Sequence, residues 1–158
     1  MADLTHLATW ASPLISGLSA ARRRLAMAEV ATYLRRSQAE RIAAQHNPDG
    51  TEFEPRKPRP KGARIRDRKG KIRRKMFTRL AAAKYLRKAS TPSTATLTIA
   101  GRAGRIARVH QYGMRDKVDW RQPKSPTVQY ARRELLGFSP HDVEAITDIL
   151  LRHITMGG

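Results

Sequence analysis

The sequence predicts an α+β fold in which a long N-terminal helix packs on a small antiparallel sheet and a further helix ends the chain. Apolar residues recur at helical spacing between Ser19 and Gln45, and Thr alternates with apolar residues from Thr94 to Ala100. Ser139-Pro140 has the composition of a helix start. We expect one domain over residues 1–158, because single domains cluster at about 100–150 residues.

The first part of the chain is predicted to form two helices. Residues 4–18 carry apolar side chains at three- and four-residue steps, and we expect Pro13 to kink this short helix. Ser19 is the expected N-cap of the long helix. The sequence Asn47-Pro48-Asp49-Gly50 ends it, because proline disfavours helix at the preceding residue and Asp-Gly suits a turn. The predicted core-facing stripe contains Met27, Val30, Ala31, Leu34 and Ile42.

Residues 47–70 are predicted to form an extended basic arm. Prolines favour extended backbone in this stretch, and its charged side chains leave little apolar surface to bury. The arm could be a solvated loop, a nucleic-acid-binding arm or an arm that becomes ordered on an acidic neighbour. The residues expected to bind the partner are Arg56, Lys57, Arg59, Lys61, Arg64, Arg66, Arg68 and Lys69.

The middle of the chain predicts a helix and a sheet. Apolar spacing from Ile72 to Leu86 indicates a helix of about three turns. The strand Thr94–Ala100 needs a partner, for which Tyr85–Ser90 and Ile106–Tyr112 are the candidates. Gly101–Arg105 lacks the Lys-Ser/Thr ending of a phosphate-binding loop, so we interpret it as a tight turn.

The last part is predicted to contain a loop and two helical segments. Residues 113–128 show little apolar periodicity and are expected to form a second long loop. Tyr130–Leu136 suggests at least one helical turn, closed by Gly137. The final helix starts at Ser139, and its apolar positions are Val143, Ile146, Leu150 and Ile154.

The composition implies an anionic partner. Lys and Arg number 32 against 13 Asp and Glu, which gives a formal charge of +19. Such a charge repels itself unless nucleic acid or an acidic protein surface offsets it. The chain has no cysteine, its histidines lack the spacing of a helical zinc site, and no apolar run approaches a membrane span. We therefore expect no catalytic residue, metal, cofactor or membrane partner.

Seven short segments are each common in proteins, but their order and spacing along the chain are specific to one protein family. They are Arg35–Gln38, Arg41–Gln45, Asn47–Thr51, Pro55–Lys57, Lys71–Phe77, Arg105–Gly113 and Tyr130–Gly137. Together they resemble the phage virion morphogenesis family, whose members include tail-completion proteins of temperate contractile-tailed phages. The resemblance favours an arm that becomes ordered on an acidic neighbour.

The resemblance implies a non-enzymatic assembly protein, made in the host cytoplasm, that completes the tail and joins it to the head at the virion neck. Expected partners are further copies in a ring, six by resemblance to tail-tube symmetry, together with tail tube or tail terminator and head-tail connector proteins. Transient contact with packaged DNA is also implied, and a small basic nucleic-acid-binding protein is the alternative function.

Two groups of residues near the sheet are interface candidates. Polar and aromatic side chains combine packing with hydrogen bonding at subunit interfaces. Packing within the chain is the alternative role for the same residues. The subunit-interface candidates are Arg108, His110, Gln111 and Tyr112, and the candidates for facing a lumen or DNA are Arg102 and Arg105.

Overall fold

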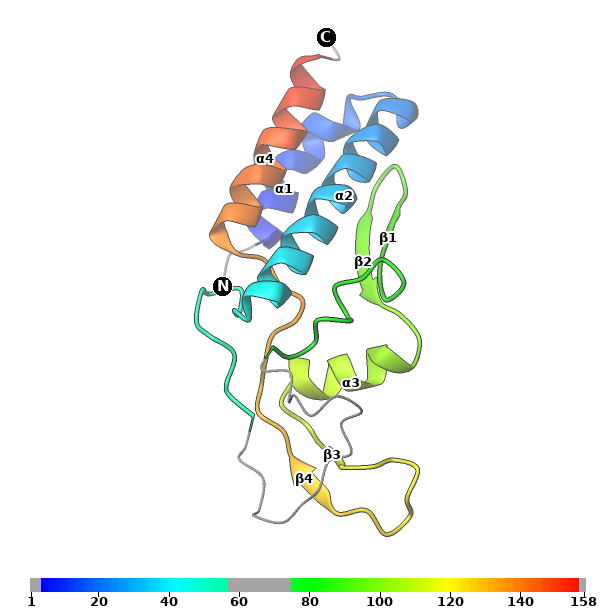
Figure 1. Cartoon of the computed structure of the whole chain (residues 1–158). Coiled ribbons are helices and arrows are strands. Elements are labelled where there is room, and N and C mark those ends of the chain that lie inside the picture. Colours follow the sequence, from blue (N-terminus) through cyan, green and yellow to red (C-terminus); the bar gives the residue numbers. More distant parts are fainter. Residues whose placement is uncertain (1–3, 57–74, 157–158) are drawn as a thin grey trace.

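The computed structural model describes residues 4–56 and 75–156 and confirms the α+β fold (Figure 1). The helices are α1 (Leu4–Ser16), α2 (Ala20–Ala44), α3 (Arg102–Gln111) and α4 (Pro140–Thr155), and the strands are β1 (Leu86–Ser90), β2 (Ala95–Ile99), β3 (Arg115–Lys117) and β4 (Thr127–Gln129). β1 pairs with β2 in one antiparallel sheet, and β3 pairs with β4 in another.

The predicted long helix is confirmed as α2. The Ser19 hydroxyl accepts a hydrogen bond from the Arg22 N–H at 3.3 Å, which satisfies one free donor of the first turn. Gln45 ends the helix in the left-handed conformation, with φ of 67°. Four of the five predicted stripe residues are buried, and Met27 is partly buried against the same core.

α1 and α4 pack with α2 at one end of the molecule (Figure 1). Their shared apolar core contains Ala11 of α1, Val30 and Leu34 of α2, and Ile146 and Leu150 of α4. Pro13 lies within α1. The predicted final helix is confirmed, and it begins with a capping box: the Ser139 hydroxyl accepts from the Asp142 N–H, and the Asp142 carboxylate accepts from the Ser139 N–H.

The β1–β2 sheet lies against α2, as predicted. Leu86 is opposite Ile99 and Lys88 is opposite Leu97 in the register. Leu86 is fully buried, and its carbonyl accepts a hydrogen bond from Arg35 Nε at 3.1 Å. The partner of β2 is therefore the strand within residues 85–90, while residues 106–111 belong to α3.

The helix predicted between Ile72 and Leu86 is wrong for its described residues, which form turns and bends from 75 to 85 and then β1. Phe77 has φ of 60°, outside the helical region. The Gln45 amide holds this turn, because it accepts from the Met76 N–H and donates to the Met76 carbonyl. Buried Met76 and Leu80 still enter a second apolar core with Ile42, Phe53, Ala107 and Leu135.

The helical turn predicted at Tyr130–Leu136 is also wrong. This segment is irregular because distant side chains take its backbone donors: Glu134 N–H donates to Asn47 Oδ1, and Leu136 N–H donates to Gln111 Oε1. Residues 113–128 are more structured than a simple loop, since β3 lies near their start and β4 begins near their end. The connecting loop between the two strands covers residues 118–126.

Candidate partner-binding surface

α3 presents cationic side chains to solvent beside β2. Gly101, with φ of 67°, turns the chain out of the strand, and α3 starts at the next residue. A Cβ at Gly104 would lie 2.6 Å from the Ile99 carbonyl oxygen, so glycine permits the close approach of helix and strand. Arg102 and Arg105 are exposed on this helix. The tight turn predicted for Gly101–Arg105 is therefore limited to Gly101, and residues 102–105 are the first turn of α3.

Trp120 occupies the tip region of the β3–β4 hairpin and is 55% exposed. The Arg121 guanidinium lies 5.6 Å from the centre of its ring and the Arg105 guanidinium 6.0 Å, both within cation–π range. The Asp119 carboxylate accepts from the Arg121 N–H at 3.0 Å, which fixes the turn around the indole. Trp120 is therefore held outward between two cations.

An ion pair joins the hairpin to α3. Arg105 donates to Asp116 Oδ1 at 2.5 Å, and this hydrogen bond holds the pKa of the Asp116 carboxyl below its usual value. Figure 1 shows α3 and the hairpin at the end of the molecule away from the α1–α2–α4 core. We call the exposed residues there the α3–hairpin surface: Arg102, Arg105, Ile106, Arg108, Tyr112, Met114, Arg115, Lys117, Val118, Trp120 and Arg121.

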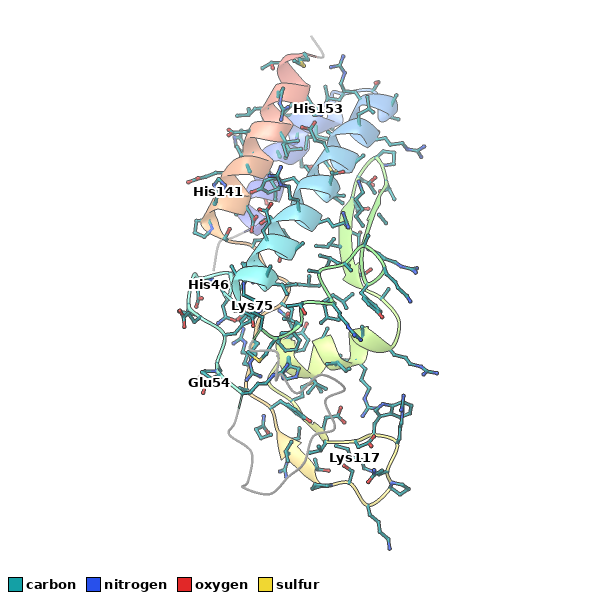
Figure 2. All side chains as sticks on the ribbon, in the orientation of Figure 1. His46, Glu54, Lys75, Lys117, His141 and His153 are labelled. Carbon is teal, nitrogen blue, oxygen red and sulfur yellow. The ribbon has the colours of Figure 1, made fainter. Side chains whose placement is uncertain are left out.

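The α3–hairpin surface combines apolar area with positive charge. Its five large apolar side chains are at least 40% exposed, and Tyr112 reaches 67%. Lys117, labelled in Figure 2, and its neighbours Arg115 and Arg121 are exposed on the hairpin. Exposed aromatic and Arg side chains of this kind are typical of interaction surfaces.

His110 and Gln111, predicted as interface candidates, are engaged within the chain. Gln111 donates to the Leu136 carbonyl at 2.7 Å and accepts from the Leu136 N–H at 2.9 Å. The His110 ring packs edge-on between Phe77 and Tyr130. Burial, and next the Arg133 charge, lower the pKa of His110 to about 4, so the ring is neutral at pH 7. Arg108 and Tyr112 remain exposed candidates.

Buried Arg133 connects His110 to the start of the predicted arm. Its guanidinium lies 3.0 Å from His110 Nδ1 and donates to the carbonyls of Glu54 at 2.7 Å and Pro55 at 3.0 Å. Arg56 follows and is exposed. The arm candidates Lys57, Arg59, Lys61, Arg64, Arg66, Arg68 and Lys69 lie outside the described residues.

The beginning of the predicted arm packs on the body of the protein. The Gly50 N–H donates to the Asn47 carbonyl at 3.0 Å in the expected turn, and Phe53 is buried in the second core. Extended, exposed backbone therefore begins only after Phe53 in the described part of this segment.

The comparison with known proteins agrees with the sequence resemblance. The profile of the phage virion morphogenesis family matches residues 2–155. The chain belongs to this family. It is 36% identical over 142 residues to tail completion protein S of Escherichia phage P2, a match that covers 89% of this chain and 90% of the relative. No solved structure matches the chain.

In this family member, segments that carry the resemblance meet around residues 130–137. Arg41 donates to the carbonyls of Glu134 at 2.8 Å and Leu135 at 3.0 Å. Asn47 and Gln111 accept from other backbone groups of the same segment. These residues therefore connect distant segments of the fold, while the side chains of the α3–hairpin surface are exposed.

Two classes of site are absent from the described part of the chain. Residues 4–56 and 75–156 contain no group of three His, Asp or Glu side chains placed to hold a metal ion. The same residues include no helix that is both long and apolar enough to cross a membrane.

Proposed function

We propose that this protein completes the phage tail and joins it to the head at the virion neck, by binding acidic tail and head proteins through the α3–hairpin surface and the basic arm. The observation that carries the proposal is the exposed Trp120 side chain, which lies between Arg105 and Arg121. The chain that carries it belongs to the phage virion morphogenesis family. The name of the P2 relative supports the tail-completion part.

Physical chemistry favours an acidic protein partner for the α3–hairpin surface. Trp, Tyr and Arg are the residue types that most often dominate binding free energy at interfaces. The formal charge of +19 accelerates association with acidic surfaces and makes it sensitive to salt. In this proposal the residues act by contact alone, with no catalytic group and no cofactor.

A ring of identical copies is part of the proposal. Repeated head-to-tail contacts close into a ring when the rotation between copies permits it. Exposed Asp49, Glu52 and Glu54 offer a local acidic counterpart to the basic α3–hairpin surface of a neighbouring copy. Six copies would match the symmetry that the family resemblance implies for the tail tube. Tail tube or terminator and head-tail connector proteins would bind the outer faces of the ring, after assembly in the host cytoplasm.

The decisive experiment compares two exposed tryptophans. Tails completed with the Trp120→Ala variant should fail to join finished heads, whereas tails completed with Trp10→Ala should join normally, because Trp10 lies on α1 and is 40% exposed away from the α3–hairpin surface. The measurement is the yield of infectious particles after mixing. Equal joining by both variants would overturn the role of this surface.

The arm is tested separately. Replacing Arg56, Lys57, Arg59 and Lys61 together by Ser should leave the melting temperature nearly unchanged and should reduce head-tail joining. Single replacements should be mild, because an exposed ion pair contributes at most about 1 kcal/mol. Normal joining by the fourfold variant would mean that these charges are only solvated.

DNA binding is the second candidate, and the same tryptophan favours it. A base can stack on an exposed indole, and Arg102 and Arg105 could meet phosphates of DNA passing through a ring. A DNA titration over a range of salt concentrations separates the two functions. Tight binding with a steep salt slope by a monomer supports nucleic-acid binding, while a discrete ring with weak DNA affinity supports assembly.

A further inference from the structure

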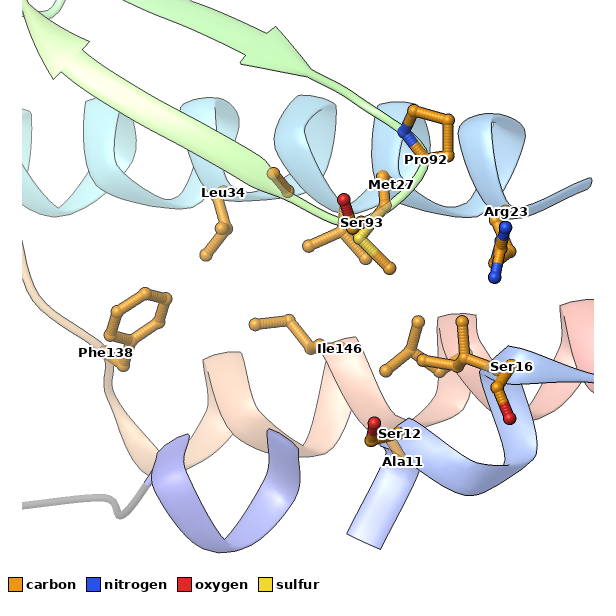
Figure 3. A pocket seen from close by; sticks show the side chains of 14 residues that line it. Ala11, Ser12, Ser16, Arg23, Met27, Leu34, Pro92, Ser93, Phe138 and Ile146 are labelled. Atoms are coloured by element: carbon orange, nitrogen blue, oxygen red, sulfur yellow. The ribbon is translucent and has the colours of Figure 1, made fainter. Parts of the chain in front are cut away.

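An apolar groove opens at the helical end of the molecule, away from the α3–hairpin surface. It has a volume of about 480 Å³. Met27 and Leu34 of α2 lie on one side, and Ile146 of α4 lies across from them (Figure 3). Val30 and Leu150 also line the groove. Val30, Leu34, Ile146 and Leu150 are buried, and the apolar side chains that stay partly exposed along the groove are Ile15, Met27 and Phe138.

The open edge of β2 borders this groove. Two hydrogen bonds, from Thr91 N–H to the Thr94 carbonyl and from Ala100 N–H to the Tyr85 carbonyl, are both 2.8 Å long. With the register of the pair, they determine which residues of β2 point their backbone groups towards β1 and which point them away. Because hydrogen-bonded and non-hydrogen-bonded pairs alternate along antiparallel strands, Ala95 and Leu97 direct their N–H and C=O groups away from β1.

Those backbone groups are available for another strand. Within the described residues, no side chain or backbone group forms a hydrogen bond with the outward N–H and C=O of Ala95 and Leu97. Ala95 lines the groove, and in Figure 3 the strand that leaves Ser93 lies between the other strand and the groove. A peptide in the groove could therefore pair with β2 as a third strand.

Arg23 gives one end of the groove a positive charge. It lines the groove near Ser16, at the end opposite Phe138 (Figure 3). Its Nε atom is buried and has no hydrogen-bond partner in the part of the chain that the structure describes. Arg23 as a whole is partly exposed, and a guanidinium binds carboxylates through its N–H groups, so the rest of this guanidinium can hold a carboxylate at this end.

We propose that the groove binds an extended, mostly apolar segment of an acidic partner protein, which adds a third strand along β2 and places a carboxylate on Arg23. From Arg23 to Leu34 the helix rises roughly 16 Å, a length that about five extended residues span. Apolar side chains on one face of the segment fill the groove, and its backbone pairs with Ala95 and Leu97. The inference goes beyond the proposed function, because it assigns a second interface at the opposite end of the molecule.

Charge and strand direction favour an acidic partner. Arg23 is the charged side chain that lines this end of the groove, and the formal charge of +19 attracts acidic protein surfaces. β2 runs from the Arg23 end of the groove towards Leu34 (Figure 3), so an antiparallel segment would bring its C-terminal end to Arg23.

The test uses the purified full chain and a synthetic probe. The probe is an acetylated seven-residue peptide in which Val and Leu alternate with Thr and the last residue is Glu. Hydrogen exchange at the Ala95 and Leu97 amides should slow on saturation with this peptide. A version N-methylated at the amides that face β2 should bind about tenfold more weakly, as expected for the loss of one or two hydrogen bonds.

Two variants locate the contacts on the protein side. Arg23→Gln should weaken the Glu peptide about tenfold and leave a peptide ending in Gln amide nearly unaffected. Ala95→Pro removes an outward N–H without removing a β1–β2 hydrogen bond, so it should abolish the exchange protection, while Ala95→Ser should retain it. Melting temperatures establish that each variant is folded.

Three results would overturn the proposal. The first is unchanged exchange at Ala95 and Leu97 at millimolar peptide with folded protein. The second is equal binding of the N-methylated peptide, which would mean that the groove takes apolar groups without strand pairing. The third is protection of the same amides that grows with protein concentration in the absence of peptide, because a second copy would then be the occupant.

Discussion

The end built from α1, α2 and α4 and the end built from α3 and the β3–β4 hairpin are stabilised by different kinds of side chain. The first buries aliphatic residues such as Leu34 and Ile146. The second also has an apolar core, but its irregular segments depend on Arg133, Gln111 and Arg41 bonded to backbone groups. Regular helices satisfy their own backbone, whereas turns and extended segments need side-chain partners when they are buried.

This difference also separates the two proposed interfaces. The α3–hairpin surface presents side chains from a helix and a hairpin, so its contacts depend on Trp120 and the flanking arginines. The groove beside β2 presents backbone groups together with an apolar wall. Substitutions that affect each end differently therefore test both the packing and the functional proposals.

The largest expected loss is in the aliphatic core. Leu34→Ala should lower the free energy of unfolding by about 3 kcal/mol, because it removes buried methyl groups and leaves a cavity. Leu34 is 5% exposed. The matched control is Leu25→Ala on the same helix, where the side chain is 63% exposed and the expected change is within about 0.5 kcal/mol. Urea unfolding measures both, and similar losses would contradict the packing of α2.

Arg133→Ala tests the polar end and should cost about 2–3 kcal/mol, since it removes a buried guanidinium together with its hydrogen bonds to the carbonyls of Glu54 and Pro55. The neighbouring variant Arg132→Ala removes only a partly exposed ion pair with Glu134 and should cost at most about 1 kcal/mol. Urea unfolding of the two variants measures the difference. A loss at position 133 no larger than that at 132 would show that these carbonyls are satisfied in another way.

His110 should make the stability of the polar end depend on pH. Its pKa falls from 6.5 to about 4 on folding, so the unfolded chain takes up a proton first as the solution is acidified. The contribution of neutral His110 to the free energy of unfolding is complete above pH 6.5 and is lost as the pH falls from 6.5 to 4. Allowing for solvent screening of this partly buried ring, we expect the free energy of unfolding to fall by about 1–2 kcal/mol between pH 7 and pH 5. His110→Asn should remove this part of the slope in urea unfolding at several pH values.

The smallest expected change in stability is at Trp120. Trp120→Ala should alter the free energy of unfolding by less than about 0.5 kcal/mol, because the side chain lies outside both apolar cores. Its cost should appear only in head-tail joining. A large fall in melting temperature would place the indole in the folding core and would remove the reason for assigning it to a partner.

Several elements were predictable because their signals are local. α2 and α4 carry caps at Ser19 and Ser139 together with apolar spacing, and both were confirmed within one residue of those caps. β2 was evident from the alternation of Thr with apolar residues. The resemblance carried by the order of the seven segments pointed to the family that the profile confirms. Trp120 carried a usable signal as well, namely an aromatic residue beside Arg121 in a polar stretch, and the sequence interpretation did not use it.

The sequence by itself determined the helices with caps, the alternating strand, the positive charge and the family of this protein. Only the tertiary structure decided that residues 75–85 form turns and bends, that residues 130–137 are irregular, and that His110 and Gln111 face inward. Those features depend on hydrogen bonds between residues far apart in the chain, such as Gln45 with Met76 and Gln111 with Leu136. Contacts of that kind leave no periodic pattern in a local stretch of sequence, because their partners meet only when the chain has folded.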